Sequence, residues 1–132
     1  MKKLETINIL VKNEQTLSWT QQEISPCNGL QTVVNGSIEC VSLPHHIDLW
    51  VNDEGLLHPE MIVNLILIWD EDPQYHQPIF GPVALAGVND EGETISLNDQ
   101  QRKWLADHLR VGILHNGNPI LAIDLTDGGA IA

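Results

Sequence analysis

Two short acidic segments of this sequence contain the carboxylate pairs that general acid–base chemistry uses. The sequence Val-Asn-Asp-Glu-Gly at residues 51–55 recurs at residues 88–92. The paired side chains are Asp53 with Glu54 and Asp90 with Glu91. Acid–base catalysis needs two carboxylates in a cleft whose surroundings differ. Asn, Asp and Gly instead favour exposed β-turns, where both carboxylates are hydrated alike. We therefore interpret both segments as acidic turns between strands.

A histidine-rich segment raises the question of a metal site. His45 and His46 precede Asp48, and His46 and Asp48 would share one face of a strand. A structural zinc site needs three or four converging ligands, and this spacing matches none of the common sets. We interpret the segment as a polar turn that enters a strand.

A second polar cluster, at residues 70–77, contains oxygen-bearing side chains that suit calcium. Its members are Asp70, Glu71, Asp72, Tyr75 and His76. A calcium-binding loop also needs a central Gly and a terminal Glu at fixed positions, and both are missing here. The segment is therefore predicted to be a solvated loop, and we predict no metal and no cofactor.

The sequence lacks the motifs of nucleophilic catalysis. It has no serine elbow and no phosphate-binding loop, and Gly87 and Gly92 form no dinucleotide fingerprint. Cys27 and Cys40 lie 13 residues apart without a second pair, which favours two reduced thiols over a disulfide or a metal pair. We predict that the protein is not an enzyme.

Hydrophobic periodicity and turn residues predict the elements that position these groups. We expect strands at residues 6–11, 18–24, 37–43, 47–51 and 81–88, and a closing hairpin from 112–115 and 119–123. A short helix is predicted at 27–34, ended by Asn35-Gly36. The clearest helix is 98–109, where Asn98 can cap and Gln101 stands at the capping-box position.

Residues 59–69 are ambiguous because the run after Pro59 and Glu60 is apolar almost all round. Such a run fits a buried helix or a buried strand, and the Pro-Glu start favours a helix. The whole pattern predicts an α+β fold: a mostly antiparallel sheet with two or three helices in a single compact domain over residues 1–132. Of the tryptophans, Trp104 shares a helix face with leucines, and Trp19 and Trp50 are either core or interface side chains, with core favoured.

Several short motifs resemble those of an uncharacterised domain family. They include residues 34–41 (Val-Asn-Gly-Ser-Ile-Glu-Cys-Val), 49–57, 80–88 and 90–101, in that order. Together they resemble a small domain of unknown function that is found in bacteriophages, plasmids and other mobile elements. The resemblance covers a core at about residues 5–109 and implies a mobile-element setting without catalytic residues. Residues 110–125 would then form a hairpin extension, and residues 126–132 a frayed tail.

The charge distribution is the strongest indication of function. The chain has 18 acidic and 6 basic residues, a net charge of −12, and no Lys or Arg between Lys12 and Arg102. This excludes nucleic acids and anionic membranes as partners, because both require cationic surfaces. The N-terminal residues lack the apolar core of a signal peptide, and no apolar run reaches the length of a membrane span. We therefore expect a cytoplasmic protein.

The acidic balance favours a non-enzymatic module that binds a basic partner protein of the host. The candidate interaction surface comprises Asp53, Glu54, Asp70, Glu71, Asp72, Asp90, Glu91 and Glu93. The alternative is a small-molecule-binding protein with pockets at a homodimer interface, since the edges of the closing hairpin could pair with a second copy. The charge could also serve solubility alone.

Overall fold

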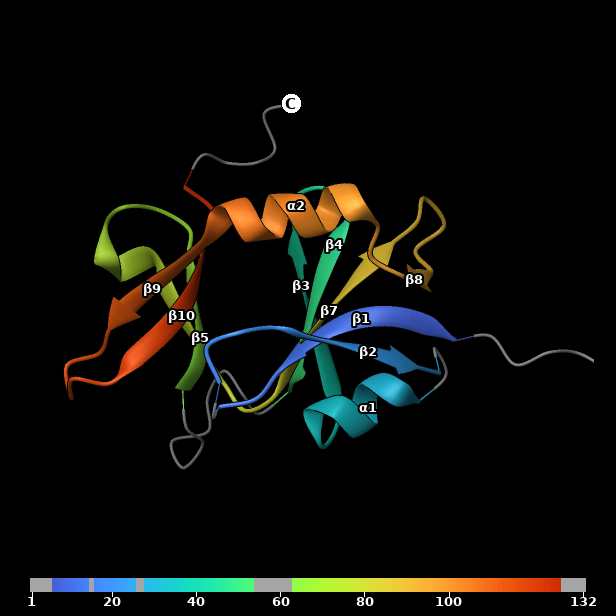
Figure 1. Ribbon diagram of the computed structural model, residues 1–132, viewed down its shortest axis with the longest axis horizontal. Helices are drawn as coiled ribbons and strands as arrows, with labels where there is room; N and C mark the ends of the chain where they lie inside the picture. The colour runs from blue at the N-terminus through green and yellow to red at the C-terminus, as the bar shows by residue number, and fades with distance from the viewer. Residues whose placement is uncertain (1–5, 15, 26–27, 54–62, 127–132) are drawn as a thin grey trace, which may run out of the picture.

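Two β-sheets form most of the protein in the computed structural model shown in Figure 1. The structure describes residues 6–14, 16–25, 28–53 and 63–126. Ten strands and two α-helices lie within this part of the chain. The molecule is therefore richer in β-structure than the predicted α+β fold, and two α-helices are present where two or three were expected.

The larger sheet, sheet A, is antiparallel throughout. Its strand order is β2-β1-β7-β4-β3, with the short β8 beside β7. The strands are β1 (Ile7–Lys12), β2 (Thr20–Ile24), β3 (Ile38–Leu43), β4 (Ile47–Asn52), β7 (Val83–Val88) and β8 (Thr94–Ile95). Each of the predicted strands before residue 52, and the one predicted at 81–88, is found here with small shifts in its ends.

The smaller sheet, sheet B, has the order β6-β5-β10-β9. Its strands are β5 (Val63–Ile68), β6 (His76–Phe80), β9 (Leu109–Ile113) and β10 (Pro119–Asp124). The predicted closing hairpin is confirmed as the antiparallel pair β9–β10. β10 also pairs in parallel with β5, so the C-terminal hairpin supplies a central strand of this sheet.

The helix at residues 59–69 was a wrong prediction, because residues 63–68 form strand β5. β5 lies between β6 and β10, so its two edges are hydrogen-bonded and both of its faces can be apolar. That arrangement produces the same uninterrupted apolar run as a buried helix. Pro59 and Glu60, which favoured the helix, lie outside the described residues. The loop predicted at 70–77 was also too long, since β6 begins at His76.

The other two predicted helices, at 27–34 and 98–109, are confirmed with small shifts in their ends. α1 (Gly29–Val34) ends at Asn35, whose φ of 63° is the left-handed conformation expected of a helix stop. α2 (Asp99–His108) begins with a complete capping box: Gln101 N donates to Asn98 Oδ1 at 2.8 Å, and Asn98 N donates to Gln101 Oε1 at 2.9 Å. A single 3₁₀ turn, η1 (Pro73–Tyr75), precedes β6.

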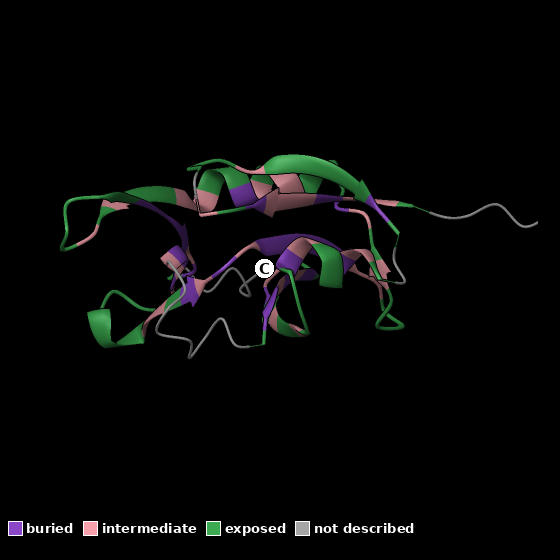
Figure 2. Ribbon diagram, turned by 90° about the horizontal axis from the view of Figure 1, so that it is seen from below, coloured by how far each residue is buried: buried purple, intermediate pink, exposed green. Residues whose placement is uncertain are grey.

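The core has two parts, one on each face of sheet A. The main core includes Leu49, Leu85, Leu65, Leu121 and Leu105, so it joins sheet A to sheet B and to α2. The second cluster includes Ile9, Ala84 and Leu30, and it lies between sheet A and α1. Trp19 and Trp104 pack against the main core and Trp50 against the second cluster, as favoured by the sequence. In Figure 2 the buried positions lie mainly on strands, whereas exposed positions occur on loops and turns, on the helices and along an outer strand.

A buried lysine links the two sheets. Lys12, at the end of β1, is only 3% exposed. Its Nζ donates to Asn64 O at 2.7 Å, to Asn13 O at 3.1 Å and to Asn64 Oδ1. Asn64 Nδ2 in turn donates to Lys12 O at 3.0 Å and to Gly81 O at 2.8 Å. Neutral oxygens therefore accept all three ammonium protons. Asn64, the polar residue within the apolar run of β5, has the structural role of holding this lysine.

The burial of Lys12 gives a testable pH dependence. Burial lowers the pKa of Lys12 from its ordinary 10.5 to about 8, opposed by the nearby charge of Glu14. Between these values the unfolded chain binds more protons than the folded protein, so the contribution of this group to the free energy of unfolding rises with pH. From near neutral pH to about pH 10, we expect the free energy of unfolding of the wild type to rise by about 2 kcal/mol relative to that of Lys12→Met, which lacks the titrating group. Urea denaturation at both pH values measures it, and a constant difference would contradict the assignment.

Candidate functional site

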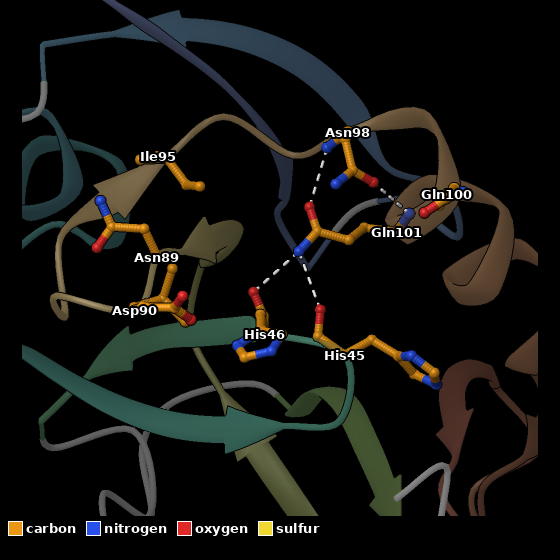
Figure 3. Close-up of a pocket in the computed structure, with 9 residues that line it drawn as sticks. His45, His46, Asn89, Asp90, Ile95, Asn98, Gln100 and Gln101 are labelled. Carbon is orange, nitrogen blue, oxygen red and sulfur yellow. Dashed lines mark hydrogen bonds between the residues drawn. The ribbon is translucent and has the colours of Figure 1, made fainter. Parts of the chain in front are cut away.

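A pocket of about 380 Å³ lies where two turns meet the start of α2 (Figure 3). One wall is the β3–β4 turn, a second is the end of β7 with the β7–β8 turn, and the third is the N-terminal end of α2. The lining residues are His45, His46, Val88, Asn89, Asp90, Ile95, Asn98, Gln100 and Gln101. The pocket therefore contains one carboxylate, several amides and an imidazole-bearing turn.

The β3–β4 turn has an unusual backbone. Leu43 pairs with Ile47, so only three residues reverse the chain. His45 and His46 have φ values of 64° and 59°, a left-handed conformation that is unfavourable for residues other than glycine. Such strain persists only where surrounding contacts impose it, and it is frequent at binding sites.

The side chain of Gln101 imposes this turn conformation. Gln101 is 7% exposed, and its Nε2 donates to His45 O at 3.0 Å and to His46 O at 2.9 Å (Figure 3). Its Oε1 completes the capping box of α2. One buried amide thus fixes the start of the helix and the turn, and it makes the pocket walls rigid relative to each other.

A glycine allows these segments to approach. A Cβ atom at Gly87 would lie 2.8 Å from Ser96 O and 3.3 Å from Gln101 Oε1. The first distance is shorter than a van der Waals contact permits, so a larger residue would displace the segment after β8 and the Gln101 side chain. The sequence contains no signal for this requirement.

The two histidines have different surroundings. The ring of His45 lies 5.1 Å from that of Trp104, whose other neighbour is the His108 ring at 4.3 Å. This contact directs the His45 ring away from the labelled acidic and amide side chains, as Figure 3 shows. The His46 ring lies on the side of the turn that faces the β7–β8 segment. His46 is therefore the imidazole available to a ligand in the pocket.

The β7–β8 turn confirms the predicted acidic turn at residues 88–92. Asn89 Oδ1 accepts hydrogen bonds from Glu91 N and Glu93 N, each at 2.9 Å, and Gly92 has a φ of 81°. Asn89 is thus occupied with holding the turn. Asp90 is exposed at the pocket, and no described side chain forms an ion pair with its carboxylate.

The structure does not bring the other predicted surface residues to this pocket. Asp53 is exposed after β4, while Glu54 and Gly55 of the first acidic turn lie outside the described residues. Asp70 and Asp72 accept hydrogen bonds from Asp72 N and Gln74 N, so they shape the turn that leads into η1. In Figure 1 this lime segment and the β7–β8 turn lie at opposite ends of the long axis. Glu71 lies in the former segment, and Glu91 and Glu93 lie in the latter turn.

The residues considered for metal binding are also separated. Asp48 is part of β4, on the face that carries Trp50, whereas His45 and His46 belong to the turn. Within the described ranges, no three His, Cys, Asp or Glu side chains are placed to hold a metal ion. Neither helix of the described chain has the length and apolar character that crossing a membrane requires.

Cys40 is exposed on β3, yet its surroundings make it a poor nucleophile. Partial burial of the side chain is the main cause that raises the pKa of Cys40 to about 12. The charge and hydrogen bonding of Asp48 add to this rise, and a hydrogen bond with Ser42 opposes it. The thiolate is the reactive form, so this thiol is nearly inert at neutral pH. Cys27 lies outside the described residues.

Comparison with known proteins identifies a family and no activity. A family model described as "Domain of unknown function (DUF3846)" matches residues 7–110. This range agrees with the predicted core at about 5–109. No curated protein and no solved structure matches the chain. The matched range ends at Arg110, the second residue of β9, so β10 lies beyond it although it is central in sheet B.

Replacing Gln101 tests the role assigned to its amide. Gln101→Leu leaves two strained carbonyls and the Asn98 N–H without this partner, and we expect a loss of about 1–3 kcal/mol in the free energy of unfolding. The control is Gln100→Leu, an exposed neighbour on the same helix, which should stay within about 0.5 kcal/mol of the wild type. Urea denaturation of the three proteins measures both values. Equal effects would refute the role of Gln101.

The raised pKa of Cys40 predicts slow alkylation. In a Cys27→Ser background we expect iodoacetamide to modify the folded protein at about pH 8 at least tenfold more slowly than the urea-unfolded chain, because a raised pKa reduces the thiolate fraction. Asp48→Asn removes the neighbouring negative charge and should accelerate the reaction of the folded protein. Mass spectrometry over time follows the product, and equal rates for folded and unfolded protein would contradict the expectation.

Proposed function

We propose that this protein, which belongs to the DUF3846 family, is a non-enzymatic acidic module that binds a basic protein partner. In the proposal the pocket at His46 and Asp90 receives one arginine or lysine side chain of that partner. The acidic segments elsewhere on the surface guide the encounter. The acidic composition of the chain and the lining of the pocket together support a basic partner.

The observation that carries the proposal is the separation of the charges on the described surface. Arg102, Lys103 and Arg110 lie on α2 and β9, and each is already engaged. Arg102 Nη1 donates to Gln21 Oε1 at 2.6 Å, Lys103 pairs with Asp107 at 3.3 Å, and Arg110 Nε lies 3.7 Å from Asp124. Among the described residues, no Lys or Arg forms an ion pair with the exposed carboxylates of Asp53, the 70–72 segment or the β7–β8 turn. The negative field therefore acts on molecules outside the protein.

The pocket offers the groups that a basic side chain requires. A guanidinium group has five N–H donors and needs acceptor oxygens. The Asp90 carboxylate and the Gln100 amide oxygen are accessible acceptors from opposite walls, and neither is used in the described hydrogen bonds. Charge-assisted hydrogen bonds of this kind are stronger than neutral ones, and arginine is frequent among the dominant residues of interfaces. The pre-formed walls reduce the entropic cost of binding.

Two considerations support a binding role over catalysis. Nucleophilic catalysis uses an activated nucleophile, whereas the pKa of Cys40 is raised to about 12. The amides of Asn89, Asn98 and Gln101 already hold the turns and the helix start. These groups provide shape to the pocket and are not free to act on a substrate.

The resemblance to domains of mobile elements extends the proposal to the origin of the partner. In that setting a module with a net charge of −12 would engage a basic host protein, as an antagonist that competes with the protein's anionic ligand. The alternative function is the binding of a small polar or cationic molecule in the same pocket. Its volume of about 380 Å³ favours this alternative, because it lies within the usual range for ligand sites.

Peptide binding tests the function. We expect a fluorescent hexa-arginine peptide to bind in dilute buffer and to dissociate in half-molar sodium chloride, because salt screens exposed charges. Asp90→Asn should weaken the affinity by about tenfold, equivalent to about 1.4 kcal/mol. The control Asp53→Asn removes the same charge outside the pocket and should change the affinity by less than about twofold. Fluorescence anisotropy measures all three proteins. Equal weakening by both substitutions would show a diffuse field without an anchoring pocket.

A further inference from the structure

β9 exposes two large apolar side chains at the edge of sheet B. Val111 is 62% exposed and Ile113 is 71% exposed, the highest values among the large hydrophobic residues of the described chain. Leu109 lies on the same face of the strand and packs against the main core. The core-facing side of β9 thus continues outward as an apolar strip of Leu109, Val111 and Ile113, whose outer two members stay largely exposed among the described residues.

The hairpin turn determines which backbone groups of β9 are free. Leu114 N donates to Asn118 O at 2.8 Å, so this pair is hydrogen-bonded, and the next pair, Ile113 with Pro119, is not. Hydrogen-bonded pairs alternate along an antiparallel ladder. Gly112 and Arg110 therefore bond to β10, whereas the N–H and C=O groups of Val111 and Ile113 point away from it.

The other sheet edges carry features that oppose strand addition. β6 contains Pro78, which cannot donate a hydrogen bond. β2 is polar and contains Glu23, and β3 contains the exposed Glu39. Charged residues and prolines are the usual means of protecting an edge. Arg110 does not protect β9, because its guanidinium bonds to Asp107 O and Leu109 O and lies near Asp124.

The local charge indicates what kind of chain can pair there. The described surface cations lie on α2 and β9, and the nearby carboxylates of Asp107 and Asp124 are each paired with one of them. A basic partner is attracted to the acidic segments elsewhere on the molecule. Two copies of this acidic chain would repel each other least at the β9 edge, where the nearby carboxylates are paired with Lys103 and Arg110.

We propose that β9 pairs with β9 of a second copy in an antiparallel two-fold dimer that joins two copies of sheet B. A two-fold axis beside Val111 places Val111 opposite the partner's Val111 and Ile113 opposite the partner's Leu109. In this register the outward N–H and C=O groups of Val111 bond to those of the partner's Val111. The outward groups of Ile113 bond to those of the partner's Leu109, and both apolar strips lie on one face. Arg110 then lies opposite the partner's Gly112, which leaves room for its side chain. The interface is isologous, as closed homodimers require.

Sedimentation equilibrium of the full chain tests the dimer. The wild type should be dimeric at micromolar to submillimolar concentrations. Val111→Lys places a charge on the edge and should raise the dissociation constant by at least about tenfold, while circular dichroism verifies that it is folded. The control Tyr75→Lys makes a similar change at a side chain that is 54% exposed and lies away from β9, and it should leave the dimer intact. A monomeric wild type, or a dimer that Val111→Lys does not weaken, would overturn the proposal.

Cross-linking tests the register without destabilising the fold. In a Cys27→Ser, Cys40→Ser background, Val111→Cys should form an intermolecular disulfide on oxidation, because paired residues have Cα atoms about 5.5 Å apart. Ile113→Cys should not, because two copies of residue 113 would be offset by four residues, about 13 Å. Cross-linking of the second variant alone, or of neither, would refute this register. The result is independent of the binding function proposed for the pocket, which lies on other elements.

Discussion

The arrangement of the two sheets depends on one buried ammonium group. Lys12 ends β1 in sheet A, and two of the three oxygens that accept its protons belong to Asn64 of β5 in sheet B. A buried charge without full hydrogen bonding would be strongly unfavourable, so this contact admits few relative positions of the sheets. Hydrophobic packing between the sheets is less directional. Lys12 also marks the start of the stretch that contains no Lys or Arg before Arg102. Because its side chain is buried, it does not offset the negative charge of that stretch at the surface.

The sequence predicted features whose causes are local. The capping box of α2 depends on residues three apart, the stop of α1 on Asn35, and the β7–β8 turn on Asn89 and Gly92. Whether an apolar run forms a central strand is not determined locally, because such a strand and a buried helix have the same composition. Residues 63–68 could therefore be assigned only with β6 and β10 in place. The contact of Lys12 with Asn64 spans 52 positions, and no local pattern signals it.

The candidate site shows the same division. Asp90 was identified from its turn, and that turn formed as expected. The role of Gln101 was only half predicted: its capping oxygen follows from the motif, but its amide nitrogen reaches carbonyls 55 and 56 residues away. The histidines were considered as metal ligands, whereas their backbone carbonyls contribute to the site as hydrogen-bond acceptors. Side-chain chemistry read from a sequence does not indicate whether the main chain of the same residue is the functional part.

The parallel pairing of β5 with β10 has a consequence for biosynthesis. Leu65 lies beside Leu121, so β5 finds this neighbour only after the long segment between the two strands has been made. Until then the nascent polypeptide presents one apolar strand without its partner, and such segments are prone to aggregate. The surrounding carboxylates would keep neighbouring nascent chains apart by mutual repulsion. The same negative charge that would attract a basic partner would in this way also protect the protein during its synthesis.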